Sequence, residues 1–151
     1  MGLKEWVLGW TKDFGVEQTG LSKQPTEYSL QTVEVAGDFE FLAKGTSYRQ
    51  DALQQLGLGA HKFVLTPERG NVHDDLAVMV QGIKGNDALH VGYLPMGSDI
   101  QAAVHEIGLA MMAKGAILAI DGEIQQGDSG LIVLISMPGT EKLSELLQEY
   151  S

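Results

Sequence analysis

The chain of 151 residues contains no cysteine. Disulfide bonds, thiolate nucleophiles and cysteine-ligated zinc sites are therefore excluded. Basic side chains are also few, because ten Lys and Arg face twenty Asp and Glu, for a formal net charge of −10 at pH 7. We do not expect such a protein to coat nucleic acid along its length, since each phosphate contact needs a cation that displaces counterions.

Long apolar runs are missing as well. The longest, residues 107–120, is interrupted by Lys114 and two glycines, and it is shorter than the ~20 residues that a helix needs to span a bilayer. The first ten residues, MGLKEWVLGW, lack the charged, apolar and small-residue regions of a signal peptide. We therefore expect a cytoplasmic protein that does not associate with membranes.

The sequence patterns of common catalytic sites do not occur. We find no Walker A, GxGxxG, HExxH, GxSxG or EF-hand pattern. The histidines are never four residues apart, and the run His73-Asp74-Asp75 is more typical of a turn than of a metal site. The prediction is a protein that is not an enzyme and holds no metal ion or cofactor.

Composition and length indicate one globular domain, with 44% apolar and 20% charged residues. Alternating or continuous apolar residues predict strands over 33–41 (interrupted at Gly37-Asp38), 62–67, 77–81, 89–94, 116–125 and 130–137. Helices are predicted over 48–56, from the cap Ser98 to about 113, and from Thr140 onward. Because helices do not alternate regularly with strands, the fold class is α+β, mainly antiparallel, a small barrel or sandwich with two or three short helices.

Three segments in the middle of the chain carry a recognisable pattern. They are GTSYRQDAL at 45–53, LTPERGNVHDDLAVMV at 65–80 and VGYLP at 91–95. In order and spacing they resemble the HIRAN family, whose members occur fused to helicase-like and nuclease proteins and as standalone bacterial proteins. The close resemblance lies within residues 43–95 and extends more loosely over 31–137.

The resemblance implies a small, modified OB-like β-barrel with helices packed against it. In the best understood members this domain captures the 3′ end of single-stranded DNA and brings a remodelling motor to a stalled replication fork. The implied partners are therefore a single-stranded DNA end and a helicase or nuclease. Such capture needs an aromatic face for a base, cations or backbone N–H groups for phosphate, and a carboxylate for the terminal hydroxyl.

Matched position by position, the resemblance implies a nucleic-acid site on this chain. Tyr48 and Arg49 fall on the family's aromatic and basic positions after the first strand. Asn71 and Asp74 fall on the Asn and Asp of the second segment, and Tyr93 falls on the aromatic or His position of the third.

Three positions depart from the family pattern. His73 stands where the family has Tyr, Val72 where it has Pro, and Leu76 where it has Asn. An imidazole at position 73 can still stack on a base and adds positive charge below neutral pH. Val72 loses the rigidity of proline, and Leu76 loses a side-chain hydrogen bond.

Positive charge is concentrated near these segments. The only two arginines, Arg49 and Arg69, both lie in them, and residues 44–73 carry four cations and two acids, a local charge of +2 that leaves −12 for the rest. A focused anion pocket on an acidic body has this distribution. It favours capture of one strand end over binding along a strand, and we include Arg69 in the site.

Ordinary structural roles stay open for the same residues. They are an ion pair of Arg49 with Asp51 or a nearby acid, an Arg69–Glu68 ion pair, packing of Tyr48 on its helix, a cross-strand contact of Tyr93 and an Asx-turn at Asp74.

A second function class is also open, a protein-interaction or homodimerisation module without nucleic-acid binding. We divide the chain into an N-terminal arm (1–30), a HIRAN-like domain (31–138) and a C-terminal helix (139–151). The two ends carry the apolar residues on which this alternative depends, namely Trp6, Trp10, Leu143, Leu146 and Leu147. The sequence does not decide between DNA and RNA, because the 2′-hydroxyl is recognised by local geometry.

Overall fold

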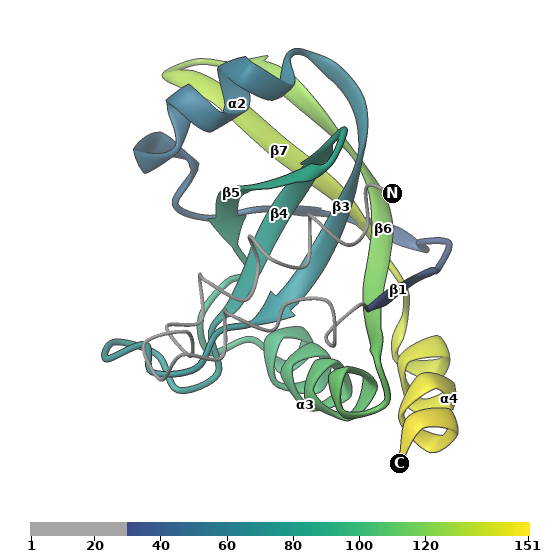
Figure 1. The fold of residues 1–151 in the computed structure, drawn as a ribbon. Helices are drawn as coiled ribbons and strands as arrows, with labels where there is room; N and C mark the ends of the chain where they lie inside the picture. The colour runs from purple at the N-terminus through teal and green to yellow at the C-terminus, as the bar shows by residue number, and fades with distance from the viewer. Residues whose placement is uncertain (1–29) are drawn as a thin grey trace, which may run out of the picture.

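The computed structural model describes residues 30–151, so the predicted N-terminal arm with Trp6 and Trp10 lies outside the described residues (Figure 1). The described part contains seven strands and three α-helices. The strands are β1 (Gln31–Glu34), β2 (Phe39–Leu42), β3 (Gly59–Pro67), β4 (Val78–Lys84), β5 (Asp87–Tyr93), β6 (Ala116–Gly127) and β7 (Gly130–Met137). The helices are α2 (Gln50–Leu56), α3 (Asp99–Ala113) and α4 (Thr140–Tyr150), and a 3-10 turn η4 (Thr46–Tyr48) precedes α2.

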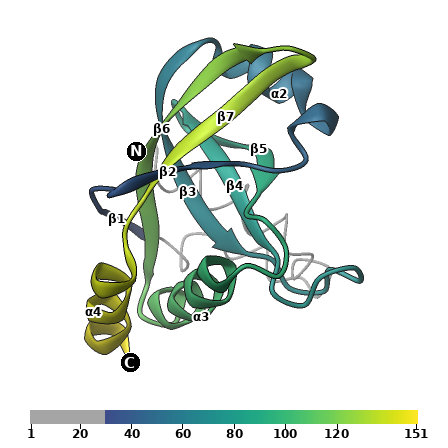
Figure 2. The ribbon, with the colours of Figure 1, turned by 180° about the vertical axis from the view of Figure 1, so that it is seen from behind.

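One sheet contains all seven strands, in the order β2-β7-β6-β3-β4-β5, with β1 beside β6. Every pairing is antiparallel except that of β1 with β6. The predicted α+β, mainly antiparallel class with three short helices is therefore confirmed. The two views place α2 at one end of the sheet and α3 and α4 at the other (Figure 1, Figure 2).

The sheet is not a closed barrel, although its two outer strands meet at one point. Lys44, two residues after β2, pairs with Tyr93 at the end of β5. The Lys44 amide donates to the Tyr93 carbonyl at 2.8 Å, and the Tyr93 amide donates back at 2.9 Å. A Cβ atom on Gly92 would lie 2.7 Å from the Lys44 carbonyl oxygen, so this approach requires glycine there.

The core is centred on Phe63 of β3, which is fully buried. Glycines on both neighbouring strands make room for its ring, because a Cβ on Gly122 would lie 2.7 Å from it and one on Gly82 3.3 Å. The strand predicted over 62–67 is β3, and it begins three residues earlier, at Gly59. Burial of aromatic and branched side chains on the inner face stabilises the sheet by roughly 1.5–3 kcal/mol per residue.

The helix predicted over 48–56 is divided in two. Gly45 adopts a left-handed conformation with φ 77°, η4 follows, and Arg49 with φ −127° separates it from α2. The Gln50 side chain donates to the carbonyls of Thr46 and Leu131, which ties the turn to β7. Tyr48 and Arg49 therefore lie before the helix and not within it.

The other two helices follow the sequence prediction. Ser98 caps α3 by accepting a hydrogen bond from the Gln101 amide at 3.2 Å. Helix α4 packs on α3, and its Leu143 and Leu146 are 2% and 3% exposed within the main core. The apolar face of the C-terminal helix is therefore covered by the same chain.

Candidate functional site

All three sequence segments contribute to one pocket of about 360 Å³, a size within the ~300–1,000 Å³ of typical ligand sites. It is lined by Lys44, Gly45, Asn71, His73, Asp74, Ala77, Tyr93, Leu94 and Met96. The Lys44–Tyr93 bridge brings the first and third segments together, and the loop between β3 and β4 supplies the second.

The loop between β3 and β4 is built by two of the predicted site residues. The side-chain oxygen Oδ1 of Asn71 accepts from the backbone amides of His73 at 2.8 Å and Asp74 at 3.1 Å. Asp74 Oδ1 accepts from the Leu76 amide at 3.0 Å, which confirms the Asx-turn interpretation of Asp74. Asn71 and Asp74 thus shape the loop that carries His73.

A carboxylate that the sequence analysis did not include lies behind the pocket. Glu68 Oε1 accepts from the Tyr93 hydroxyl at 2.9 Å and from the Asn71 side-chain amide at 2.9 Å. This joins the end of β5 to the start of the loop. Glu68 was identifiable from sequence only as a neighbour of Arg69, because nothing in the pattern indicates its distant partner Tyr93.

Two ionisable groups next to this carboxylate are strongly perturbed. Burial raises the pKa of Tyr93 to about 12, assisted by the hydrogen bond to Glu68. Burial lowers the pKa of His90 to about 4, and the positive charge of Arg49 acts in the same direction. The two rings are in edge-to-face contact with centroids 4.7 Å apart, so the aromatic contact of Tyr93 is with a residue of its own strand.

The two arginines act on different residues near the pocket. Arg49 is close enough to lower the pKa of the Tyr93 hydroxyl, partly opposing burial and Glu68. Arg69 acts on His105 of α3, whose pKa is lowered mainly by burial and is raised in part by Asp74. The ion pairs within residues 30–151 involve lysines only, so the Arg49–Asp51 and Arg69–Glu68 pairs were wrong predictions.

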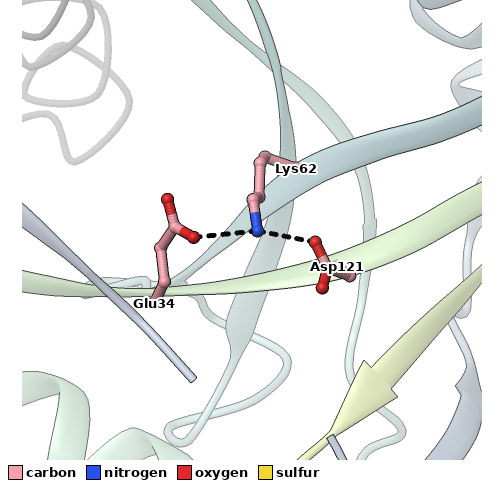
Figure 3. A network of polar contacts seen from close by, with 3 residues as sticks. All are labelled: Glu34, Lys62 and Asp121. Atoms are coloured by element: carbon pink, nitrogen blue, oxygen red, sulfur yellow. Dashed lines mark hydrogen bonds and ion pairs between the residues drawn. The ribbon is translucent and has the colours of Figure 1, made fainter. Parts of the chain in front are cut away.

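Among the charged residues counted over positions 44–73, Lys62 and Asp51 do not line the pocket. Lys62 forms ion pairs with Glu34 at 3.0 Å and Asp121 at 2.6 Å, away from the pocket residues (Figure 3). These acids raise its pKa, chiefly through the hydrogen bond to Asp121. Asp51, in the first turn of α2, does not line the pocket.

The net positive charge near the pocket is smaller than the +2 counted over residues 44–73 of the sequence. Of the charged side chains in residues 30–151, only Lys44 and Asp74 line it. Together with Arg49 and Glu68, which act on Tyr93, and Arg69, which acts on His105, they sum to +1 instead of +2. The site is still the opposite in sign to the chain as a whole, which carries −10.

Three predicted site residues, Tyr48, Arg49 and Arg69, do not line the pocket. The Tyr48 side chain is 87% exposed on η4, so the alternative in which it packs on the helix is wrong. It directly precedes Arg49 in the chain and is exposed to solvent.

A buried amide also belongs to the site. Gln101 of α3 donates to Asp74 Oδ2 at 2.6 Å and accepts from the Gly97 amide at 3.0 Å. In the sequence it is one polar residue in an amphipathic helix, and the only local signal was its position three residues after the cap Ser98.

Among residues 30–151, no three His, Asp or Glu side chains are grouped so that they could hold a metal ion. None of the helices in this range is both long enough and apolar enough to cross a membrane. No protein-family model, no curated protein and no solved structure matches the chain.

Proposed function

We propose that the pocket captures the terminal nucleotide of a single-stranded nucleic acid, in the manner of the HIRAN family, without catalysis. One observation carries the proposal: the three segments that resemble the family converge on one pocket, although up to fifty residues separate them. In this proposal the sheet is a modified OB-like barrel in which the Lys44–Tyr93 bridge stands in for full closure.

The groups around the pocket are suited to the parts of a nucleotide. Lys44, Arg49 and Arg69 supply the positive charge that phosphate requires. The rings of His73 and Tyr93 and the side chain of Met96 offer surfaces for a base.

A strand end requires one more contact. The Asp74 carboxylate uses one bond at each oxygen, and an ionised carboxylate has about four acceptor sites, so it retains capacity for a terminal hydroxyl. Tyr48, exposed next to Arg49, is placed to stack on the following base.

Charge argues for the end of a strand over its length. A site of +1 on a body of −10 has few cations for further phosphates. Such a module, acting in the cytoplasm, would present a strand end to a helicase or nuclease partner.

The alternative of a protein-interaction or dimerisation module has lost one of its supports. Leu143 and Leu146 are buried in the core, which leaves that face of α4 unavailable to a second protein. The tryptophans of the N-terminal arm lie outside the described residues.

The test is fluorescence anisotropy with a short labelled single-stranded DNA at ~50 mM salt, a concentration that favours phosphate contacts. One oligonucleotide carries a free 3′-hydroxyl and the other a 3′-phosphate. We expect tighter binding of the free end. Equal affinity for both would refute end capture, and no binding at low salt would refute the nucleic-acid function.

Variants locate the binding on the protein. Arg49→Ala and Asp74→Ala should each weaken binding about tenfold or more, as expected for a lost charge-assisted contact. The matched control is Lys142→Ala, which removes a cation from an exposed pair on α4. A loss of affinity in Lys142→Ala equal to that in Arg49→Ala would mean that only net charge matters.

A further inference from the structure

Gln101 is the most enclosed polar group at the pocket. It is 1% exposed, and both ends of its side-chain amide are bonded. The nitrogen donates to Asp74 Oδ2 at 2.6 Å, and the oxygen accepts from the Gly97 amide at 3.0 Å. A buried amide with these partners cannot turn over without breaking both bonds.

Its two partners belong to the two loops that form the pocket walls. Asp74 is in the loop between β3 and β4, and Gly97 is in the loop between β5 and α3, next to the pocket residue Met96. Gln101 stands between them on the first turns of α3, a rigid element anchored in the core through Val104. Gln101 is therefore a direct side-chain link between the two loops.

We propose that Gln101 is a positioning residue that fixes the two walls of the pocket relative to each other, so that the site is formed before the ligand arrives. Asp74 accepts a hydrogen bond from the Gln101 side-chain amide at Oδ2 and one from the Leu76 backbone amide at Oδ1, which holds its carboxylate in one orientation. The consequence for binding rests on the proposed function, whereas the consequence for loop order does not.

Exchanging the donor and the acceptor tests the bond itself. In Gln101→Glu, two carboxylates face each other at 2.6 Å. In Asp74→Asn, two amide nitrogens face each other, while the bond from Leu76 is kept. The double variant restores a donor opposite an acceptor and also retains an acceptor for Gly97, and its total charge equals that of the parent chain.

The first readout needs no ligand. Amide hydrogen exchange of the full chain at one pH reports the opening of the loops at His73, Asp74, Leu76 and Gly97. We expect exchange about tenfold faster or more in each single variant, as the loss of a hydrogen bond to a charged group implies, and recovery of most of this factor in the double variant.

The second readout is the affinity for the free-end oligonucleotide. A positioning role and a purely electrostatic effect predict opposite changes in affinity for Asp74→Asn, because this variant removes a negative charge from the site. If positioning dominates, both single variants bind more weakly. The double variant regains loop order but not the full parent affinity, because asparagine at position 74 lacks the carboxylate that is proposed to accept the terminal hydroxyl. If only charge matters, Asp74→Asn binds more tightly, and the proposal is overturned.

The control is Gln125→Glu on β6, where an exposed amide also donates to a carboxylate, that of Glu123, at 3.1 Å. It should leave loop exchange and affinity unchanged. If the loop amides of the double variant exchange as fast as those of the single variants, the positioning role is overturned. Failure of the parent chain to bind any oligonucleotide would refute the proposed function alone, because the exchange result stands independently.

Discussion

At the scale of single residues, the polar side chains around the pocket bond to one another before any ligand is present. Asn71 bonds Glu68 and two amides of its own loop, and Asp74 bonds Leu76 and Gln101. The resemblance to the HIRAN family implied that Asn71 and Asp74 belong to the site. Neither the resemblance nor residue spacing indicated Glu68 or Gln101, because these bond to partners 25 and 27 residues away.

His90 provides a test of burial at this scale. Its pKa is about 4 in the folded protein, against 6.5 for an unperturbed histidine, so the folded state holds it neutral. Its contribution to stability is complete above pH 6.5 and declines as the pH falls toward 4, since the unfolded chain then binds a proton that the folded chain does not.

We expect the free energy of unfolding to decrease by about 2 kcal/mol more in the parent chain than in His90→Phe between pH 7 and pH 4.5. Phenylalanine retains a ring beside Tyr93 but does not titrate. Urea denaturation at the two pH values measures the difference. Equal losses in the two proteins would show that His90 is not the group responsible.

At the scale of elements, strands and long helices followed apolar periodicity closely. The cap Ser98 and the hairpin between β6 and β7 lie where the sequence predicted them. The segment before α2 did not, because a left-handed Gly45 and the bonds of Gln50 to Thr46 and to β7 interrupt the helix. The second of these contacts joins residues 81 apart, which local patterns cannot reveal.

Helix α4 gives the prediction at this scale. Leu146→Ala should lower the free energy of unfolding by about 2–5 kcal/mol, because it leaves a cavity between α4 and α3. Glu145→Ala, an exposed neighbour on the same helix, should change it by less than about 0.5 kcal/mol. Chemical denaturation of both variants measures this. A loss below about 1 kcal/mol in Leu146→Ala would contradict the packing of α4 on the core.

At the scale of the whole molecule, the distribution of charge sets the expected salt dependence. Lys44 lines the pocket, Arg49 and Arg69 act on residues next to it, and Lys62 is paired with Glu34 and Asp121 elsewhere. If the pocket captures a strand end as proposed, these cations can contact one to three phosphates. The logarithm of the association constant should fall with the logarithm of salt concentration with a slope of about −0.7 to −2.

Anisotropy titrations between ~50 and ~200 mM salt measure this slope. A slope of about −5 or steeper would indicate a long basic groove, and it would contradict capture of a single end by an acidic body. The control varies the length of the oligonucleotide, because the affinity of end capture should not depend on bases far from the terminus.

The sequence by itself determined the class of fold, the boundaries of most elements and the three segments that meet at the pocket, because periodicity, caps and turns are local properties of the chain. Only the tertiary structure decided which residues meet and what they bond to. It placed Lys62 in ion pairs elsewhere, left Tyr48 exposed, and bonded Glu68 and Gln101 to the pocket residues Tyr93 and Asp74. The physical reason is that a hydrogen bond or ion pair depends on distances of about 3 Å between side chains that the fold brings together from distant positions.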